Sequence, residues 1–431
     1  MPISDIILFF VAGLAMLLMG VPISPVMAII GLIGGLLAFG YPFINSIGSV
    51  VWGVHNSFIL TAVPLFILMG EILLRSGVAD KMYTAMAKWM NWFPGNLLHT
   101  NIGCCALFAA TTGSSVACAA TVGTVSLPTL NERGFSKKLS LGSLAAGGTL
   151  GILIPPSIAL IIYGSLTNNS ISQLFVAGVI PGITLTLIFI VYLFIASIWI
   201  RNTGVVPVSW AERLRAVPDM LPPLFIFFVV MGSIYFGIAT PTESAALGIV
   251  VSLFFAWRSG KLTFQLLHKC FVNTAQLTGM IILIITAAFI LNLTLSLLGI
   301  AEMLTQQVLS LNLSLTQLIL VMIVFYLILG MFLDVLSIQV ATIPIAYPIM
   351  TGAGADPIWF GVFIVLMSEV AMITPPMGMN LFVIQGVRPD KGPLSDVIWG
   401  ALPFALIMLA FTVILIFVPE LVTWLPAKMK G

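Results

Sequence analysis

The amino-acid sequence predicts an all-α protein that crosses a membrane many times. Of its 431 residues only 30 are charged, 16 Lys or Arg and 14 Asp or Glu, whereas 60% are hydrophobic. Soluble domains carry about 25% charged residues, so this chain has too few polar side chains to cover a water-soluble surface of its size. A net charge of +2 also leaves no basic face, and nucleic acid is therefore not an expected partner.

Long uncharged segments, divided by turn residues, set the number of expected spans. A helix needs about 20 apolar residues to cross a bilayer, and clusters of Gly, Pro and Asn divide the longer runs. The first segment has no Lys or Arg before it and carries Asp5, so we interpret it as a span and not as a signal peptide. Ten spans are expected, at 4–21, 24–40, 56–74, 139–166, 174–200, 221–238, 242–257, 271–298, 358–386 and 395–418.

Two further apolar segments, 95–130 and 315–350, are each broken in the middle. Basic residues lie on both sides of the first, at 75–88 and 133–138. Both flanks are then cytoplasmic under the positive-inside rule, so this segment is expected to enter and leave by one face, as a re-entrant hairpin. The count of spans places the flanks of the second on the opposite face, and these flanks contain no basic residue. This topology leaves both chain termini external.

Hairpins that enter from opposite faces indicate an inverted repeat. A shift of 220 residues places Pro155-Pro156 on Pro375-Pro376. Proline has no N–H, so the carbonyl oxygens one turn earlier, at Gly151 and Ala371, are expected to lack their helical donors. Unpaired carbonyls at membrane depth are tolerated only where they line a cavity or bind something. Both spans are therefore predicted to be broken, each offering oxygen atoms to a cation such as Na⁺.

The tips of the two hairpins supply complementary groups. In the first hairpin the entering helix is expected to end near Thr112 and the leaving helix to start near Ser114. The carbonyls of a helix end favour cations, and the N–H groups of a helix start favour anions. The second tip, at 330–337, carries Asp334. Two cation sites with an anion between them are what a Na⁺-coupled carrier of organic anions requires.

Several motifs resemble one family. They are Ala62-Val-Pro-Leu-Phe-Ile-Leu-Met-Gly70, Thr112-Gly-Ser-Ser115, the stretch from Ala145 to Ile154-Pro-Pro-Ser157, and Thr240-Pro-Thr-Glu-Ser-Ala-Ala246. With a likeness from about residue 5 to 420, the chain resembles the large membrane subunit of tripartite ATP-independent periplasmic (TRAP) transporters. The resemblance implies a Na⁺-driven elevator-type importer in the bacterial inner membrane, surrounded by lipid, with periplasmic termini. Its implied partners are a separate small four-helix membrane subunit and a periplasmic substrate-binding protein.

The resemblance also implies two Na⁺ sites and a class of substrate. The first site comprises Ala109, Thr112, Gly151, Ile154 and Pro155, and the second comprises Gly330, Ala371, Thr374 and Met377. The candidate substrate-binding residues at the tips and broken spans are Ser114, Ser115, Ser157, Asp334, Ser337 and Asn380. The expected substrate is a small carboxylate, either a sialic acid or a C4-dicarboxylate.

These assignments divide the chain into segments with different expected roles. Segments 1–92 and 221–298 are expected to form a scaffold, and 93–200 and 299–419 to form two transport repeats, each a hairpin, a broken helix and a final span. Between the halves, 201–220 is expected to lie along the cytoplasmic interface, and 420–431 to be an external tail.

Acidic residues inside a membrane are functional candidates by default. Glu71 is interpreted as the ion-pair partner of Arg75, one turn away, and Glu243 as a helix cap after Thr240. Glu369 lies less than two turns before the second break, and the sequence does not assign it a role.

Three other functions compete with a binding-protein-dependent carrier. A stand-alone Na⁺- or H⁺-coupled dicarboxylate or citrate symporter would share the architecture. A channel would need a continuous polar helix face, whereas the polar residues cluster at two tips. An intramembrane enzyme would need a nucleophile–base pair or a metal set. Neither H-E-x-x-H nor G-x-x-x-x-G-K occurs, so the protein is not expected to be an enzyme.

Overall fold

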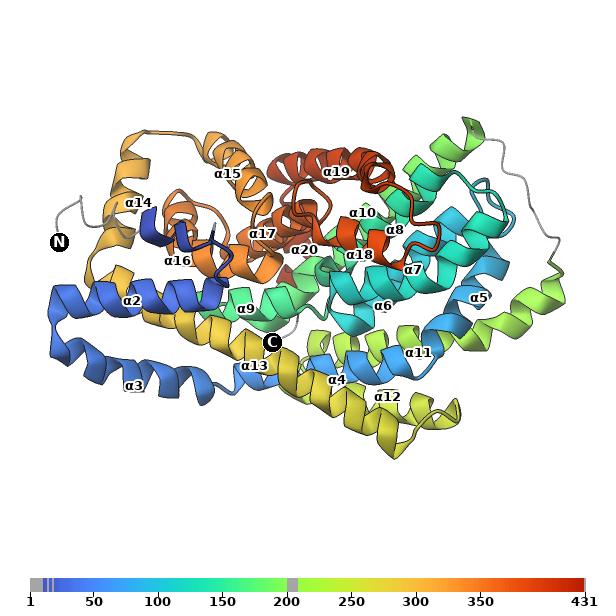
Figure 1. The fold of residues 1–431 in the computed structure, drawn as a ribbon, viewed down its shortest axis with the longest axis horizontal. Helices are drawn as coiled ribbons and strands as arrows, with labels where there is room; N and C mark the ends of the chain where they lie inside the picture. Colours follow the sequence, from blue (N-terminus) through green and yellow to red (C-terminus); the bar gives the residue numbers. More distant parts are fainter. Residues whose placement is uncertain (1–10, 14, 18, 200–207, 430–431) are drawn as a thin grey trace.

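The computed structural model describes residues 11–13, 15–17, 19–199 and 208–429 (Figure 1). All regular structure in these ranges is helical. The helices are α2 (Ile23–Phe39), α3 (Tyr41–His55), η1 (Ile59–Thr61), α4 (Ala62–Arg75), α5 (Val78–Met90), α6 (Leu97–Thr112), α7 (Ser115–Glu132), α8 (Lys137–Leu153), α9 (Ile158–Thr167), α10 (Ile171–Trp199), α11 (Trp210–Tyr235), α12 (Pro241–Arg258), α13 (Phe264–Leu297), α14 (Ile300–Ser310), α15 (Leu315–Gly330), α16 (Val335–Gly352), α17 (Pro357–Met372), α18 (Met379–Val387), α19 (Leu394–Phe417) and α20 (Glu420–Ala427). Half of the expected first span, 4–21, lies outside the described residues, and its residues 11–13 and 15–17 are helical.

Six helices in the described ranges are long and apolar enough to cross a membrane, when α8 and α9 are counted as one. A seventh is added if α3 and the η1–α4 segment, which meet at an angle of 52°, form one bent span. The helices α2, α6, α15 and α17 are apolar but shorter. Helices α6 and α15 are short because they end at the hairpin tips. Helix α17 is short because it ends before the second Pro-Pro pair. The fold is that of an all-α membrane protein with many apolar helices.

Two segments differ from the sequence expectation. Residues 41–55, expected to connect two spans, form helix α3, with Pro42 in its first turn, a position that suits proline because no helical donor is needed there. Helix α11 begins at Trp210, inside the expected interfacial segment, and continues to Tyr235 through three prolines. A capping box between Ser209 and Glu212 fixes its start.

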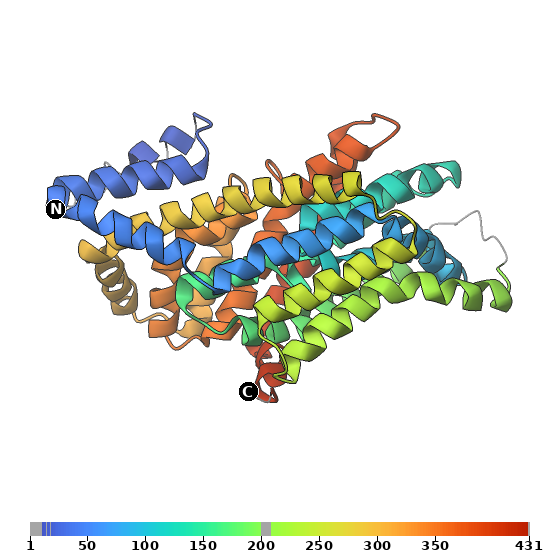
Figure 2. The same cartoon turned by 90° about the horizontal axis from the view of Figure 1, so that it is seen from below.

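The helices form two groups that lie side by side (Figures 1 and 2). One group contains α2, α3, α4, α11, α12 and α13 and runs along the lower side of Figure 1; it is called the scaffold group after the role expected from the sequence. Its members are joined by hydrogen bonds such as that from Asn273 to Glu71 (3.2 Å) and that from Thr294 to the Gly31 carbonyl (2.7 Å). Helix α5 connects this group to the rest, since Tyr83 donates to Asn101 of α6 (3.1 Å).

The hairpin group contains α6 to α10 and α15 to α19, and it repeats one order of elements. Each half has a helical hairpin, a broken helix and one long helix. The two halves pack against each other through four pairs of helices. They are α7 with α18, α8 with α19, α9 with α16, and α10 with α17. Tyr163 donates to the Pro357 carbonyl (2.6 Å), and Asn380 donates to the Ala145 carbonyl (3.2 Å). The two halves therefore form one packed unit.

Helices α8 and α19 meet backbone to backbone. A Cβ atom placed on Gly142 would lie 2.0 Å from the carbonyl oxygen of Gly400, and one placed on Gly400 would lie 2.1 Å from the carbonyl oxygen of Lys138. Small residues allow this close approach, which is a common device for packing helices in membranes. Both glycines are therefore required by the packing of the two halves.

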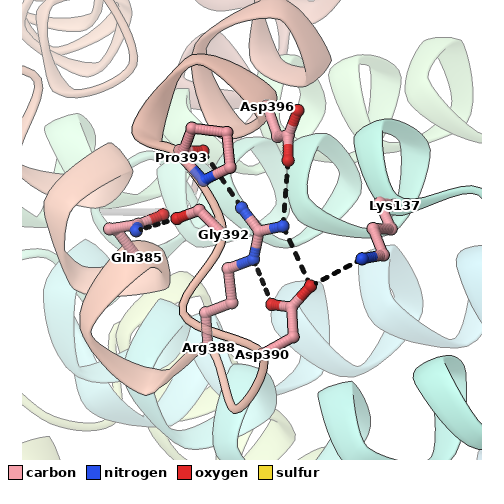
Figure 3. A network of polar contacts seen from close by, with 7 residues as sticks. All are labelled: Lys137, Gln385, Arg388, Asp390, Gly392, Pro393 and Asp396. Atoms are coloured by element: carbon pink, nitrogen blue, oxygen red, sulfur yellow. Dashed lines mark hydrogen bonds and ion pairs between the residues drawn. The ribbon is translucent and has the colours of Figure 1, made fainter.

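A network of charged side chains joins the two halves where α8 and α19 begin (Figure 3). The Arg388 side chain is 2% exposed and pairs with Asp390 and with Asp396 (2.9 Å). It also donates to the Pro393 carbonyl (3.0 Å). Lys137, in the first turn of α8, pairs with Asp390 (2.9 Å). The network thus joins α8 of the first half to the loop between α18 and α19 of the second.

Replacing Arg388 with methionine is expected to destabilise the protein by about 2 kcal/mol. Breaking a fully buried pair costs about 3–5 kcal/mol, and the value here is lower because the Asp390 and Asp396 side chains are about a quarter exposed. Thermal unfolding of the purified protein in detergent would measure the loss. A melting temperature equal to that of the unchanged protein would contradict this estimate.

The same network predicts a dependence of stability on acid pH. The hydrogen bond from Arg388, with help from Lys137, holds the pKa of Asp390 well below its usual range, although burial acts in the opposite direction. A carboxyl whose pKa is depressed by folding stabilises the protein above its ordinary pKa of about 3.9 and loses this contribution as pH falls below that value. Melting temperatures measured from neutral pH downward should fall in acid, and Asp390→Asn should weaken that fall.

Candidate functional site

The first hairpin tip has the boundaries predicted from the sequence. Helix α6 ends at Thr112, and Gly113 has a φ of +59°, a left-handed conformation that suits glycine. Ser114 caps α7, with its hydroxyl accepting from the Ala117 N–H (3.4 Å). The first broken span is likewise confirmed, because α8 ends at Leu153 and α9 starts after Ser157. The tip therefore presents one helix end and one helix start.

The first tip lies directly against the first break. A Cβ atom on Gly151 would lie 2.7 Å from Cα of Ser115 and 2.8 Å from the carbonyl oxygen of Ser114. One on Gly113 would lie 2.9 Å from the Pro156 carbonyl oxygen. The fold thus brings together the two segments of the expected first Na⁺ site, which are about 40 residues apart in sequence.

Helix α4 also reaches this tip. A Cβ atom on its residue Gly70 would lie 3.1 Å from Cα of Thr112 and 3.4 Å from the Thr112 carbonyl oxygen. Gly70 closes one of the motifs on which the family resemblance depends. The scaffold group therefore contacts the hairpin group where the expected first Na⁺ site lies.

Several oxygen atoms in the first site already have partners within the chain. The Ala109 carbonyl accepts from the Gly113 N–H (3.2 Å), and the Thr112 hydroxyl donates to the Phe108 carbonyl (3.0 Å). The Thr112 hydroxyl oxygen keeps lone pairs for a cation. The Gly151 carbonyl lacks its helical donor because Pro155 has no N–H. Oxygen atoms of this kind suit a hard cation.

The second tip and the second break meet in the same way. Asp334 caps α16 by accepting from the Leu336 N–H (3.2 Å) and from the Ser337 hydroxyl. A Cβ atom on Gly330, the last residue of α15, would lie 2.4 Å from Cβ of Ala371. Two residues of the expected second Na⁺ site are therefore in contact.

One expectation about the second break is wrong. The Ala371 carbonyl does have a donor, the N–H of Thr374 at 3.2 Å. Pro375 has no N–H to donate from four residues ahead of Ala371. The chain turns tightly after α17, however, so the N–H three residues ahead donates instead. The Thr374 hydroxyl donates to the Val370 carbonyl (2.7 Å), just as Thr112 does at the first site.

The two breaks differ in exposure. Residues 151–157 of the first break are buried throughout. In the second break, Met377 is 53% exposed, and Met379, the first residue of α18, is 43% exposed. The second break therefore reaches the molecular surface in this conformation, whereas the first is covered by the tip of its hairpin and by α10, whose Gly178 lies against the Leu153 carbonyl oxygen.

The six candidate substrate-binding residues fall into two sets. Ser115, Ser157, Ser337 and Asn380 are buried, whereas Ser114 and Asp334 are partly exposed. The Ser157 hydroxyl accepts from the Leu160 N–H (3.4 Å) as a helix cap. In this conformation Ser114 and Asp334, one at each tip, are the members of the set that reach the surface.

The other acidic residues also have defined positions. Glu71 pairs with Arg75 (2.9 Å), which confirms the expected ion pair. Glu243 accepts from the Thr240 N–H (2.8 Å) and so caps the start of α12 as expected, within a capping box. Glu369 accepts a hydrogen bond from Ser115 of the opposite half. Sequence reasoning missed this contact, because the residues are 254 positions apart.

The packed unit of hairpins and broken helices has the same fold as a solved membrane transporter. A solved structure with the same overall fold is the YdaH transporter of Alcanivorax borkumensis, with a TM-score of 0.62 and 11% identity over 87% of this chain and 88% of that one. The family model described as "Tripartite ATP-independent periplasmic transporter, DctM component" matches residues 10–421. The chain belongs to this family of TRAP transporter large membrane subunits.

Relatives named for different substrates are similar to this chain. The C4-dicarboxylate TRAP transporter large permease protein DctM of Vibrio cholerae is 33% identical over 98% of both chains. The ectoine TRAP transporter large permease protein TeaC of Halomonas elongata is 28% identical over 96% of both. The sialic acid TRAP transporter permease protein SiaT of Haemophilus influenzae is 30% identical over 86% of this chain and 60% of its own length.

Proposed function

We propose that this protein is the Na⁺-driven permease subunit of an importer of small organic acids. The observation that carries the proposal is the contact of each hairpin tip with a broken helix, at Gly151 on Ser114 and at Gly330 on Ala371. Each contact gathers carbonyl and hydroxyl oxygens beside a helix end, where the dipole favours a cation. Two such places in one packed unit provide for two coupling ions.

The division of the helices supports an elevator movement. The hairpin group holds together through contacts between its halves, including Tyr163 with Pro357 and Lys137 with Asp390. The scaffold group has hydrogen bonds of its own, such as Asn273 with Glu71. The hairpin group would carry ions and substrate across the membrane as one body, sliding along the scaffold group.

The placement of basic segments supports ten spans and two hairpins with both termini external. Helix α5, the α7–α8 turn, the beginning of α11, the α12–α13 turn and the α18–α19 loop lie toward the same end of the molecule, at the right in Figure 1. These segments carry most of the basic residues, and the positive-inside rule makes that end cytoplasmic. Cysteine labelling from either side of inner-membrane vesicles would test this orientation.

A C4-dicarboxylate is the first substrate to test, with a sialic acid second. The similarity to C4-dicarboxylate permeases extends over nearly the whole chain, whereas the sialic acid relative matches 86% of it. The partners to include are a small four-helix membrane subunit and a periplasmic binding protein loaded with substrate. Uptake into proteoliposomes should then require an inward sodium gradient and the binding protein.

Two outcomes of that assay would change the proposal. Uptake that is indifferent to the sodium gradient would refute the coupling. Uptake of free substrate by this chain alone would favour a stand-alone dicarboxylate or citrate symporter.

Replacing Thr112 or Thr374 with alanine is expected to weaken sodium binding several-fold, because each change removes one hydroxyl oxygen beside a break and keeps the backbone oxygens. Each hydroxyl donates to a carbonyl one turn earlier, so its lone pairs are free for a cation. Sodium dependence of uptake at saturating substrate would measure the change. Thr124→Ala, on the exposed face of α7, is the control, since its hydroxyl also donates one turn back. Unchanged sodium curves for both variants would refute the site assignment.

A further inference from the structure

A cavity of about 310 Å³ lies between the scaffold group and the hairpin group. On the scaffold side it is lined by Val50, Gly53 and Val54 of α3, by Phe289 of α13, and by Leu60 of η1, which connects α3 to α4. On the other side it is lined by residues at the end of α9, in the hairpin group. Its volume falls in the range of about 300–1,000 Å³ that small-molecule pockets occupy. A ligand in this cavity would therefore touch both groups.

Helix α3 leaves space in the cavity because it carries a glycine there. Val50, Gly53 and Val54 are spaced by three and four residues, so they lie on one face of the helix. A Cβ atom added to Gly53 would have no atom within 4 Å. The space beside Gly53 is thus open to a ligand, and a larger side chain at this position would fill it.

Three polar side chains line the cavity where the end of α9 packs near η1. They are those of Ser57, Ser165 and Asn168, and none of them has a hydrogen-bond partner among the described residues. Hydroxyl and amide groups both donate and accept hydrogen bonds. The other lining residues are apolar or glycine. The cavity therefore offers an apolar wall for a hydrocarbon chain and a small polar region for a head group.

The electrostatics of the cavity exclude an anion as its ligand. None of the residues that line it is charged. Helix α9 ends here, with Asn168 as its C-cap, and the carbonyl end of a helix carries a partial negative charge. A carboxylate would lose its hydration in this place without gaining a positively charged partner. The cavity is therefore not a second site for the expected carboxylate substrate.

The volume limits the size of the ligand. An apolar cavity of about 150 Å³ binds benzene, so a cavity of about 310 Å³ has room for roughly twice as many atoms. This space fits one short alkyl chain with a small head, whereas a phospholipid with two long chains is too large.

We infer that this cavity binds an uncharged amphiphile that has one short alkyl chain and a hydroxyl head. The chain lies against α3 and α13, and the head bonds to the polar side chains at the end of α9. Because the ligand contacts the scaffold group and the hairpin group at once, it holds them in this arrangement and opposes sliding of one along the other. This effect on sliding rests on the proposed function, whereas the binding itself does not.

Protection of an introduced cysteine from a maleimide would detect the ligand on the purified protein in lipid nanodiscs. The four natural cysteines are buried, so Ser165→Cys should react selectively. Addition of 1-decanol should slow this reaction several-fold and in a saturable manner. The control is Thr124→Cys, on the exposed face of α7 and outside the cavity, which should react at the same rate with and without the alcohol.

Two glycine variants of α3 show whether the protection comes from this cavity. Gly53→Phe, combined with Ser165→Cys, should fill the cavity and abolish the effect of 1-decanol on labelling. Gly48→Phe is the matched control, because an added Cβ on Gly48 also has no atom within 4 Å, and five residues of α-helix turn it about 140° away from Gly53.

The labelling results can overturn the inference in three ways. Protection that persists in Gly53→Phe would place the ligand elsewhere. Equal protection of Thr124→Cys and Ser165→Cys would show a general effect of the alcohol. If Gly53→Phe fails to fold, lack of any protection of Ser165→Cys by 1-decanol would still refute binding.

Decyl sulfate, which has the same alkyl chain and a negative charge, tests the electrostatic argument. It should protect Ser165→Cys much less than 1-decanol does at equal concentration, because the cavity provides no positive charge and lies at the carbonyl end of α9. Equal protection by the two compounds would contradict the preference for an uncharged head.

Sodium-driven uptake into proteoliposomes is the second readout. At the concentrations that slow labelling, 1-decanol should inhibit uptake by the unchanged protein and by Gly48→Phe, and it should not change the uptake that Gly53→Phe retains. Protection from labelling without inhibition of uptake would refute the effect on sliding. Absence of uptake by the unchanged protein without alcohol would count against the proposed function, while the labelling result would still decide whether the cavity binds the amphiphile.

Discussion

Replacing Gly151 with leucine is expected to abolish sodium-driven uptake while the protein still reaches the membrane. A Cβ atom at this position would lie 2.7–2.8 Å from backbone atoms of Ser114 and Ser115. Backbone cannot move aside as a flexible side chain can, so the tip must separate from the break. The oxygens that the two segments bring together would then no longer surround one ion. We expect uptake to fall to background and the sodium dependence to disappear.

A matched substitution separates this local effect from the general cost of a larger side chain. Gly386, on α18 of the same helix group, has no atom within 4 Å of an added Cβ. Gly386→Leu should therefore keep most of the uptake. If Gly151→Leu transported at a rate similar to Gly386→Leu, the contact between tip and break would not be required for transport.

Replacing Gly142 with alanine is expected to destabilise the whole protein. The added methyl group would lie 2.0 Å from the Gly400 carbonyl oxygen, so α8 and α19 would have to move apart along their crossing. Overpacking costs about 1–3 kcal/mol and occasionally more, and a backbone clash at this distance belongs at the upper end. Thermal unfolding should show a lower melting temperature, with reduced yield of folded protein.

The control for Gly142→Ala is a glycine-to-alanine change at a site with free space, which should not lower the melting temperature. Gly232, within α11, has no atom within 4 Å of an added Cβ, and alanine is favoured over glycine in a helix by about 1 kcal/mol. Gly232→Ala should therefore leave the melting temperature unchanged or raise it. Equal melting temperatures for Gly142→Ala and Gly232→Ala would show that the α8–α19 crossing can absorb a methyl group.

Local features of the sequence were sufficient to predict the hairpins and broken helices. Proline removes a backbone donor wherever it stands, so the two Pro-Pro pairs define two breaks without knowledge of the fold. The glycine and serine of the first tip likewise fit a helix end followed by a helix start, and the structure confirms these boundaries. Helix α3 was missed because its polar residues and glycines weaken the apolar pattern of residues 41–55.

The partners of the carbonyl oxygens could be predicted only in part. Whether the Ala371 carbonyl lacks a donor depends on how the chain turns after α17, and this turn supplies the Thr374 N–H. At Gly151 the N–H three residues ahead, that of Ile154, donates to the Leu150 carbonyl instead (3.0 Å), so the turn supplies no replacement there. Loss of one hydrogen bond follows from residue type, whereas its replacement follows from geometry.

The sequence by itself determined that this protein lies in a membrane, where its hairpins turn and where its helices break. Those properties depend on hydrophobicity, charge and the backbone chemistry of nearby residues. Only the tertiary structure decided that Ser115 meets Glu369, that Lys137 meets Asp390, and that α8 touches α19. Such contacts join residues some 250 positions apart, and they form because helices from opposite halves pack together, which no local pattern encodes.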